Sequence, residues 1–280
     1  MSEETLPIYR LTPSNYPALT TGSLKAGLVC FLLSLCPYFV ESTLAAPPYP
    51  FNAEYEAKYG GFKANAERSL FFSENGQIEM TTSLKLKLLG KTLSSITEQS
   101  ILDIDPQNNQ FRPVDYSFTQ TGIGKRGRQI NFDWKAGTAL YDDGKIETQT
   151  PLQIGLADNL SSYLEVSKQL QAGNQDIFFP AIDKGNIEQL HFKVRGEELI
   201  STHSGKFRTI KIEKIRGPNS KRTTQMWLAL DWDYLLVKLV QIENSGKNLS
   251  LELKRATVND IVVTGFVGQD NTQEINKETD

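Results

Sequence analysis

Apolar and polar side chains alternate with a period of two through most of the chain from Phe51 onward. The clearest run places mostly apolar residues at every second position from Ile78 to Leu88, with charged or polar residues between them. The segments 190–195 and 249–254 repeat this pattern. Successive side chains of a strand point to opposite faces of its sheet, so this alternation is typical of strands with one buried and one wet face. The sequence therefore predicts a mainly β protein.

Segments typical of tight turns separate the predicted strands. Each contains glycine, proline, asparagine or aspartate, the residues that turns favour. They are Gly60–Gly61, Glu74–Gly76, Asp105–Asn109, Asp142–Gly144, Gly217–Asn219 and Asn244–Gly246. Short turns join antiparallel neighbours, and a sheet of many strands with one apolar face must curl or be covered. We therefore expect a large antiparallel curved sheet or an open β-barrel.

The segment from Leu152 to Ala172 predicts the one substantial amphipathic helix. Asp158 can cap its start, and Gly173 follows its end. Its apolar residues recur at helical spacing and are Leu156, Leu160, Tyr163, Leu164 and Leu170. We expect this helix to cover part of the apolar face of the sheet.

The N-terminal segment resembles an export signal. Lys25 precedes an apolar run, Ala26–Val40, which is shorter than the roughly 20 residues that cross a bilayer. Small residues follow and predict cleavage after Ala45, so we expect an exported, periplasmic protein. The alternatives are an uncleaved N-terminal anchor and acylation of Cys30 or Cys36. The polar stretch before Lys25 is long for a signal peptide, so a translation start further along the chain is a further alternative.

The signal divides the chain into a leader over 1–45, a single β-rich domain over 46–267 and a polar tail over 268–280. The tail lacks periodicity, so we expect it to be disordered. Both cysteines, Cys30 and Cys36, fall in the leader, so the domain is expected to use neither a disulfide nor thiol chemistry. A formal net charge of −3 gives no electrostatic basis for binding nucleic acid.

Candidate catalytic residues are few. His191 and His203 are the only histidines, and they fall on the polar face of a predicted strand and in a predicted hairpin turn. Turn formation explains the carboxylate pairs Asp142–Asp143 and Asp231–Asp233. No metal-ligand spacing or cofactor motif accompanies these residues. We therefore expect no catalytic residues and no cofactor, with a hydrolase as a remote alternative.

Two groups of residues are candidates for binding. Aromatic residues within and beyond 226–239 can line a cavity for an apolar ligand, although a hairpin buried on both faces is the alternative. The expected lining residues are Phe71, Phe72, Phe178, Phe179, Trp227 and Trp232. In the glycine-rich loop 122–128, Lys125, Arg126 and Arg128 can hold an anion or a lipid headgroup, unless the loop is simply a solvated hairpin tip.

Several stretches, in order along most of the domain, resemble an exported bacterial family catalogued as domain of unknown function 3108. They are Pro50–Gly61, Phe111–Tyr116, Phe132–Trp134, Asp158–Tyr163, Val194–Glu198 and Trp227–Asp231. The resemblance implies an envelope or periplasmic location and transfers no catalytic residues. Where the family's usual pattern has a proline after the Trp227 strand, this chain has Leu236. The family's general look is similar to open β-barrel carriers of lipids or lipoproteins, which is a fold-level analogy.

The expected function is a periplasmic, non-catalytic binding or carrier module for a lipid-like or other apolar ligand. The alternative is an envelope assembly or scaffold protein with a fully packed core, whose partner is another envelope protein. Membrane contact is compatible with both, although the domain has no stretch long enough to span a bilayer. A void next to the apolar face distinguishes the two.

Overall fold

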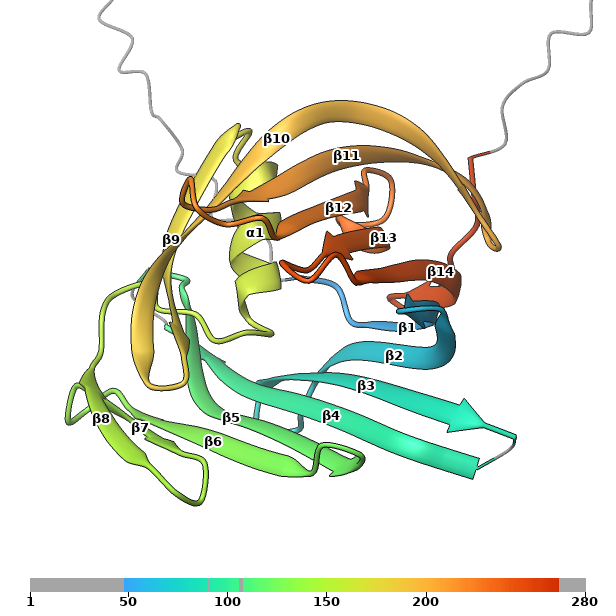
Figure 1. Cartoon of the computed structure of the whole chain (residues 1–280). Coiled ribbons are helices and arrows are strands. Elements are labelled where there is room, and N and C mark those ends of the chain that lie inside the picture. Colours follow the sequence, from blue (N-terminus) through green and yellow to red (C-terminus); the bar gives the residue numbers. More distant parts are fainter. Residues whose placement is uncertain (1–47, 90, 106–107, 267–280) are drawn as a thin grey trace, which may run out of the picture. The chain divides into compact units, whose positions relative to one another are not determined.

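The structure is a computed structural model that describes residues 48–89, 91–105 and 108–266. The predicted signal segment with its cleavage site and both cysteines, and the predicted tail, lie outside the described residues. Within them, all 15 strands belong to one antiparallel sheet that does not close, and one helix packs against it (Figure 1). The predicted fold class, mainly β with a large antiparallel sheet and one helix, is confirmed.

The first eight strands run in chain order from the centre of the sheet to one edge, each antiparallel to the next. Turn chemistry explains the hairpins. Gly60 and Gly61, for example, join the first two strands with φ angles of 54° and 91°, which favour glycine. The strands are β1 (Phe51–Tyr59), β2 (Phe62–Phe72), β3 (Ile78–Leu88), β4 (Lys91–Ile104), β5 (Phe111–Gly122), β6 (Arg126–Asp133), β7 (Thr138–Asp142) and β8 (Glu147–Pro151).

The remaining strands build the other half of the sheet in reverse order. The penultimate strand, β14, pairs with β1, so the first and last long strands meet at the centre, and β9 forms the second edge. The strands are β9 (Asp176–Asp183), β10 (Asn186–Thr202), β11 (Gly205–Ile215), β12 (Thr223–Ala229), β13 (Leu235–Ile242), β14 (Asn248–Val258) and β15 (Ile261–Val262), which pairs with β14.

Helix α1 (Ser162–Gln171) is shorter than the predicted 152–172, so the first half of that prediction is wrong. The side chain of Asp158 accepts the backbone N–H groups of Leu160 and Ser161 at 2.7 and 2.8 Å, which closes a turn instead of extending the helix. Just before this turn, Ala157 pairs with the outer edge of β9. The predicted end is correct, because Gly173 follows α1 with φ 80°.

Helix α1 contacts both halves of the sheet. The ring of Tyr163 meets that of Phe51 edge-on, with centroids 6.0 Å apart, and the Arg68 guanidinium lies 4.9 Å from the same ring. The Tyr163 hydroxyl donates to the Tyr234 carbonyl at 3.0 Å, and Gln169 donates to a carbonyl of β9. The sheet therefore curves around α1 (Figure 1).

The two edges of the sheet are short or covered. β8 has five residues and ends in Pro151, and Ala157 occupies part of the outer edge of β9. The hydroxyl of Thr150 on β8 donates to the carbonyl of Gly185, at the tip of the β9–β10 hairpin. These two strands end the sheet, but β10 extends beyond β9. Its residues 196–202 pair with β11 on one side and with no described strand on the other, which leaves a free strand edge there. In the described part of the chain, no helix has the length and hydropathy needed to cross a membrane.

Candidate functional site

A row of apolar side chains crosses the centre of the sheet on the face that carries α1. Cross-strand partners share a face, and each member of the row is paired directly with the next. In order from β12 to β3, the row consists of Met226, Leu239, Leu251, Ala57, Ala64 and Leu86. We call these residues the apolar row. Six strands at about 4.8 Å spacing give it a length of about 24 Å.

The apolar row lies away from helix α1. Phe51, which contacts α1, and Ala57 point to the same face of β1 and are six residues apart, which is about 20 Å along a strand. Ala57 is buried, and the other members of the row are only half-buried. Their neighbours Leu84, Ile96 and Leu249 on the same face are half-buried too. The face that forms the core beneath α1 therefore continues as an apolar surface that water can reach.

The opposite face of these strands is polar, and Trp227 lies on it. The Trp227 ring lies between two ammonium groups, those of Lys211 and Lys238, at 4.9 and 5.2 Å from its centroid. Its Nε1 donates to Glu198 at 2.8 Å. Trp227 is only 6% exposed because these charged side chains cover it. The structure therefore places Trp227 across the sheet from the apolar row.

The other predicted aromatic residues are scattered. Phe71 and Phe72 lie exposed at the end of β2, at 41% and 40%. Phe178 stacks on His191 with ring centroids 4.1 Å apart, on the polar face of β9 and β10. Its neighbour Phe179 points to the other face and is buried in the core. The structure does not bring these four phenylalanines together.

Trp232 lines a small cavity between α1 and the start of β1. The cavity has about 20 Å³ of space, enough for about one water molecule. The carboxylate of Asp233 at this site accepts the backbone N–H of Tyr49 at 3.1 Å and the side-chain amide of Gln171 at 2.8 Å. Burial raises the pKa of Asp233, and these hydrogen bonds oppose the rise. An acyl chain does not fit here, so a lipid would have to bind on the open apolar face.

The predicted basic loop connects β5 to β6, and Arg128 of this loop is bound within the protein. Its guanidinium lies 4.7 Å from the ring centroid of Phe118. It also donates to the hydroxyl of Tyr116 at 3.2 Å and forms an ion pair with Asp183 at 3.6 Å. Arg128 is therefore held by side chains of its own chain.

Lys125 and Arg126 are the exposed cations of the same loop. Arg126 lies over the Phe118 ring at 5.2 Å. It pairs with Gln120, which pairs with Ile96, so Arg126 shares a face with the surface that flanks the apolar row. Of the three predicted headgroup residues, Lys125 and Arg126 remain accessible.

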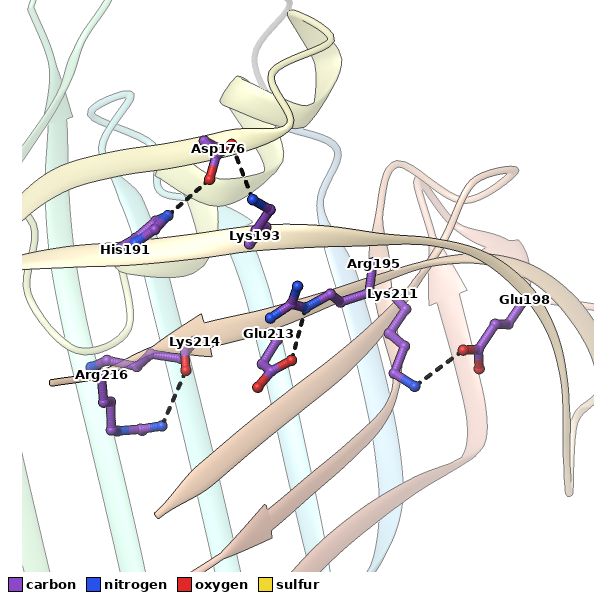
Figure 2. A network of polar contacts seen from close by, with 9 residues as sticks. All are labelled: Asp176, His191, Lys193, Arg195, Glu198, Lys211, Glu213, Lys214 and Arg216. Atoms are coloured by element: carbon purple, nitrogen blue, oxygen red, sulfur yellow. Dashed lines mark hydrogen bonds and ion pairs between the residues drawn. The ribbon is translucent and has the colours of Figure 1, made fainter. Parts of the chain in front are cut away.

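The two histidines lie far apart on β10 and in its turn. His191 Nε2 is 3.0 Å from Asp176, which also pairs with Lys193 at 3.8 Å (Figure 2). His203 lies in the hairpin turn that the sequence predicts, with its Nδ1 3.2 Å from Glu252. Twelve residues of strand separate the histidines, about 40 Å if the strand is straight. The structure does not combine them in one site.

The two predicted carboxylate pairs belong to turns. Asp142 accepts the backbone N–H of Gly144, and Asp143 accepts two further N–H groups of the same turn. Asp231 forms an ion pair with Arg208. These carboxylates are thus already engaged in hydrogen bonds or an ion pair within the protein.

Asp158 is a fully buried carboxylate next to α1. It accepts hydrogen bonds from the Ser100 hydroxyl and from the backbone N–H groups of Leu160 and Ser161. Burial raises the pKa of Asp158 from its ordinary value of 3.8 to about 6, although these hydrogen bonds act in the opposite direction. The turn before α1 therefore carries a group that titrates in the mildly acidic range.

Three cations that the sequence analysis did not single out border the apolar face. Lys214 and Arg216 lie at the end of β11 (Figure 2), and Arg222 precedes β12. Lys214 is two residues from the buried Ile212 on the same strand and therefore points to the same face. The change from isoleucine to lysine and arginine at positions of the same parity is the sequence signal that marks this border.

Comparisons with known proteins identify a family. The model described as "Protein of unknown function (DUF3108)" matches residues 54–254. No curated protein matches the chain.

A solved structure is similar to this chain in fold, and a second match has a low TM-score. A β-barrel-like protein of domain of unknown function DUF1849 from Brucella abortus has a TM-score of 0.52 at 10% identity, covering 76% of this chain and 99% of that chain. At this identity the similarity concerns the fold alone. A "putative exported protein with YmcC-like fold" from Bacteroides fragilis has a TM-score of 0.30 at 12% identity, covering 75% of this chain and 100% of that chain.

The family match extends from β1 to β14, and it includes α1 and the whole apolar row. It covers well over half of the chain, and it confirms the resemblance that the sequence stretches carry. The chain therefore belongs to DUF3108, a family of proteins of unknown function.

Proposed function

We propose that this protein is a non-catalytic binding or carrier module for a lipid-like ligand and that it works in the cell envelope after export. The observation that carries the proposal is the apolar row, which continues the core-forming face of the sheet about 20 Å beyond the contact between Phe51 and α1. Soluble proteins rarely leave a contiguous apolar surface of this kind without a ligand or partner.

The energetics favour an acyl chain as the ligand. The row is about 24 Å long, and its half-buried members are apolar. A methylene group that leaves water for such a surface contributes up to about 0.8 kcal/mol. No bond of the ligand needs to be made or broken, so the proposal requires no catalytic group.

Fatty acids with acyl chains of different length test this proposal. We expect the delipidated protein to bind laurate, myristate and palmitate with an affinity that rises by up to about fourfold per methylene, because each methylene buries more apolar surface. Isothermal titration calorimetry measures these affinities. Failure to bind any of the three, or equal affinity for all of them, would contradict the proposal.

Export is a separate part of the proposal, and it rests on the signal-like segment after Lys25. We expect the protein in the envelope fraction to begin at Ala46, because small residues precede that position. N-terminal sequencing of the purified protein measures this. A protein that retains residues 1–45, or that stays with the ribosomal and soluble cell fraction, would contradict export with cleavage.

The second candidate is an envelope assembly or scaffold protein. The cavity beside α1, with room for about one water molecule, favours it, because the core at that place is packed. In this case a segment of another protein would cover the apolar row. Mass spectrometry of the material that co-purifies with the protein distinguishes the candidates, since the first predicts lipid and the second predicts a polypeptide.

A further inference from the structure

Three cationic side chains gather where β11 ends and β12 begins. Arg216 donates from Nη2 to the Thr224 hydroxyl at 2.9 Å and from Nη1 to the carbonyls of Lys214 and Arg222, both at 3.5 Å. These hydrogen bonds hold the guanidinium at the border of the sheet face. We call Lys214, Arg216 and Arg222 the basic border.

The basic border has more cations than carboxylates. Lys214 pairs with Glu188 and Arg222 pairs with Glu243, each at 3.4 Å. Arg216 has no carboxylate within 4.0 Å among the residues that the structure describes. A guanidinium that hydrogen-bonds only neutral oxygens beside two other cations is a favourable place for an anion.

Electrostatics of the cluster point in the same direction. Burial lowers the pKa of Arg216 and the charge of Arg222 lowers it further, while the charges of Glu188 and Glu243 oppose this. Burial also lowers the pKa of Lys214, with Arg216 and Arg222 adding to the effect and Glu188 opposing it. An anion bound among these groups would relieve the repulsion between the cations.

The basic border lies at one end of the apolar row. Thr224, which holds Arg216, and Met226 of the row lie on one face of β12, two residues or about 7 Å apart. Thr224 also pairs across the sheet with Gln241, which pairs with Leu249. A ligand with its charged group at Arg216 would therefore place its chain directly on the row.

We infer that Arg216, supported by Lys214 and Arg222, binds the carboxylate or phosphate group of an amphiphile whose acyl chain lies on the apolar row. This inference rests on the proposed function and adds to it the charge of the ligand and the direction in which it lies. It assigns the headgroup to the basic border instead of the loop with Arg126. The basic border adjoins β12, the first strand of the row, whereas Arg126 on β6 lies three strands beyond β3, the last strand of the row.

The test compares a charged and a neutral amphiphile with the same chain. Palmitate and monopalmitoylglycerol are titrated into the delipidated wild-type protein and into Arg216→Gln. We expect the substitution to weaken palmitate binding about 10-fold, the effect of losing one charge-assisted contact, and to leave monopalmitoylglycerol binding unchanged. Arg216→Lys keeps the charge and should retain most of the palmitate affinity.

Two further variants are controls. Arg195→Gln removes an arginine that pairs with Glu213 at 2.8 Å on the polar face of β10 and β11 (Figure 2), so it should bind both ligands like the wild type. Arg126→Gln tests the sequence-predicted loop. Circular dichroism and thermal unfolding verify that each variant folds.

Each contrary result has a distinct meaning. If the wild type binds neither amphiphile, the proposed function fails and the inference fails with it. If both bind and Arg216→Gln weakens neither or weakens both equally, the lipid-binding proposal stands and the headgroup inference is wrong. A specific loss of palmitate in Arg126→Gln would also overturn it. If inorganic phosphate binds the wild type but not Arg216→Gln, and palmitate does not displace it, the site takes a free anion instead of an amphiphile.

Discussion

Replacing Leu251 with glutamate is expected to weaken palmitate binding by more than about 100-fold. Leu251 lies at the centre of the apolar row, between its partners Leu239 and Ala57. A bound acyl chain would cover the new carboxylate, and the desolvation of a charge costs several kcal/mol, of which about 3 kcal/mol already corresponds to 100-fold. Titration calorimetry with palmitate measures the loss.

The adjacent residue supplies a matched control. Ser250 points to the opposite face of β14, where it lies beside Val240 and Lys58. Ser250→Glu adds the same charge one residue away and should leave palmitate affinity at the wild-type level. Leu251 is half-buried, so its replacement can be solvated in the free protein, and thermal unfolding checks that the fold persists. Equal losses in the two variants, or no loss in Leu251→Glu, would exclude the apolar row as the binding surface.

Asp158→Asn is expected to stabilise the protein at neutral pH and to have little effect at pH 3.5. The wild-type carboxyl has a pKa of about 6 in the folded state, against an ordinary value of 3.8. Below pH 3.8 the carboxyl group is mostly protonated in both the folded and the unfolded state, so its ionisation has little effect on stability. As the pH rises to 6, the unfolded chain ionises while the folded protein keeps its proton, and the contribution of this group to stability falls.

The size of the effect follows from the two pKa values. At 1.36 kcal/mol per pH unit, the difference between 3.8 and about 6 corresponds to about 3 kcal/mol, fully developed above pH 6. Asparagine cannot ionise, and its oxygen can still accept the N–H groups of Leu160 and Ser161 while its amide donates to Ser100. Urea unfolding of both proteins at pH 3.5 and pH 7 measures the difference. If the difference in unfolding free energy between the two proteins does not change with pH, or favours the wild type at pH 7, the raised pKa of Asp158 does not lower stability at neutral pH.

The architecture could be predicted from the sequence because its causes are local. Alternation along a strand reports which side chains share a face, and glycine, asparagine and aspartate mark the turns. The helix start could not be predicted in this way. Leu156 and Leu160 have helical spacing and are both buried, but Leu156 precedes the turn that Asp158 closes, Leu160 lies within that turn, and neither belongs to α1. The spacing of apolar residues alone does not distinguish a helix from a turn whose apolar side chains are also buried.

The candidate site depends on register, which the sequence does not display. Trp227 is the most conspicuous residue of its strand, yet alternation and pairing place it against Lys211 and Lys238 on the polar face. The apolar row contains ordinary aliphatic residues from six strands, and only the pairing aligns them. The basic border is likewise assembled from a strand end and the segment before the next strand. Aromatic content is therefore a poor guide to the binding face of this sheet.

The pairing of β1 with β14 has a consequence for how the chain becomes a protein. Phe51 pairs with Val258, a partner 207 residues further along the chain. Synthesis proceeds from the N-terminus, so one side of β1 stays without its partner until nearly the whole polypeptide has emerged. Contacts this distant in sequence slow folding, and an unpaired strand can associate with other chains in the meantime. A nascent chain of this kind needs to be shielded during synthesis, and a truncation before β14 would leave the central strand of the sheet exposed to aggregation.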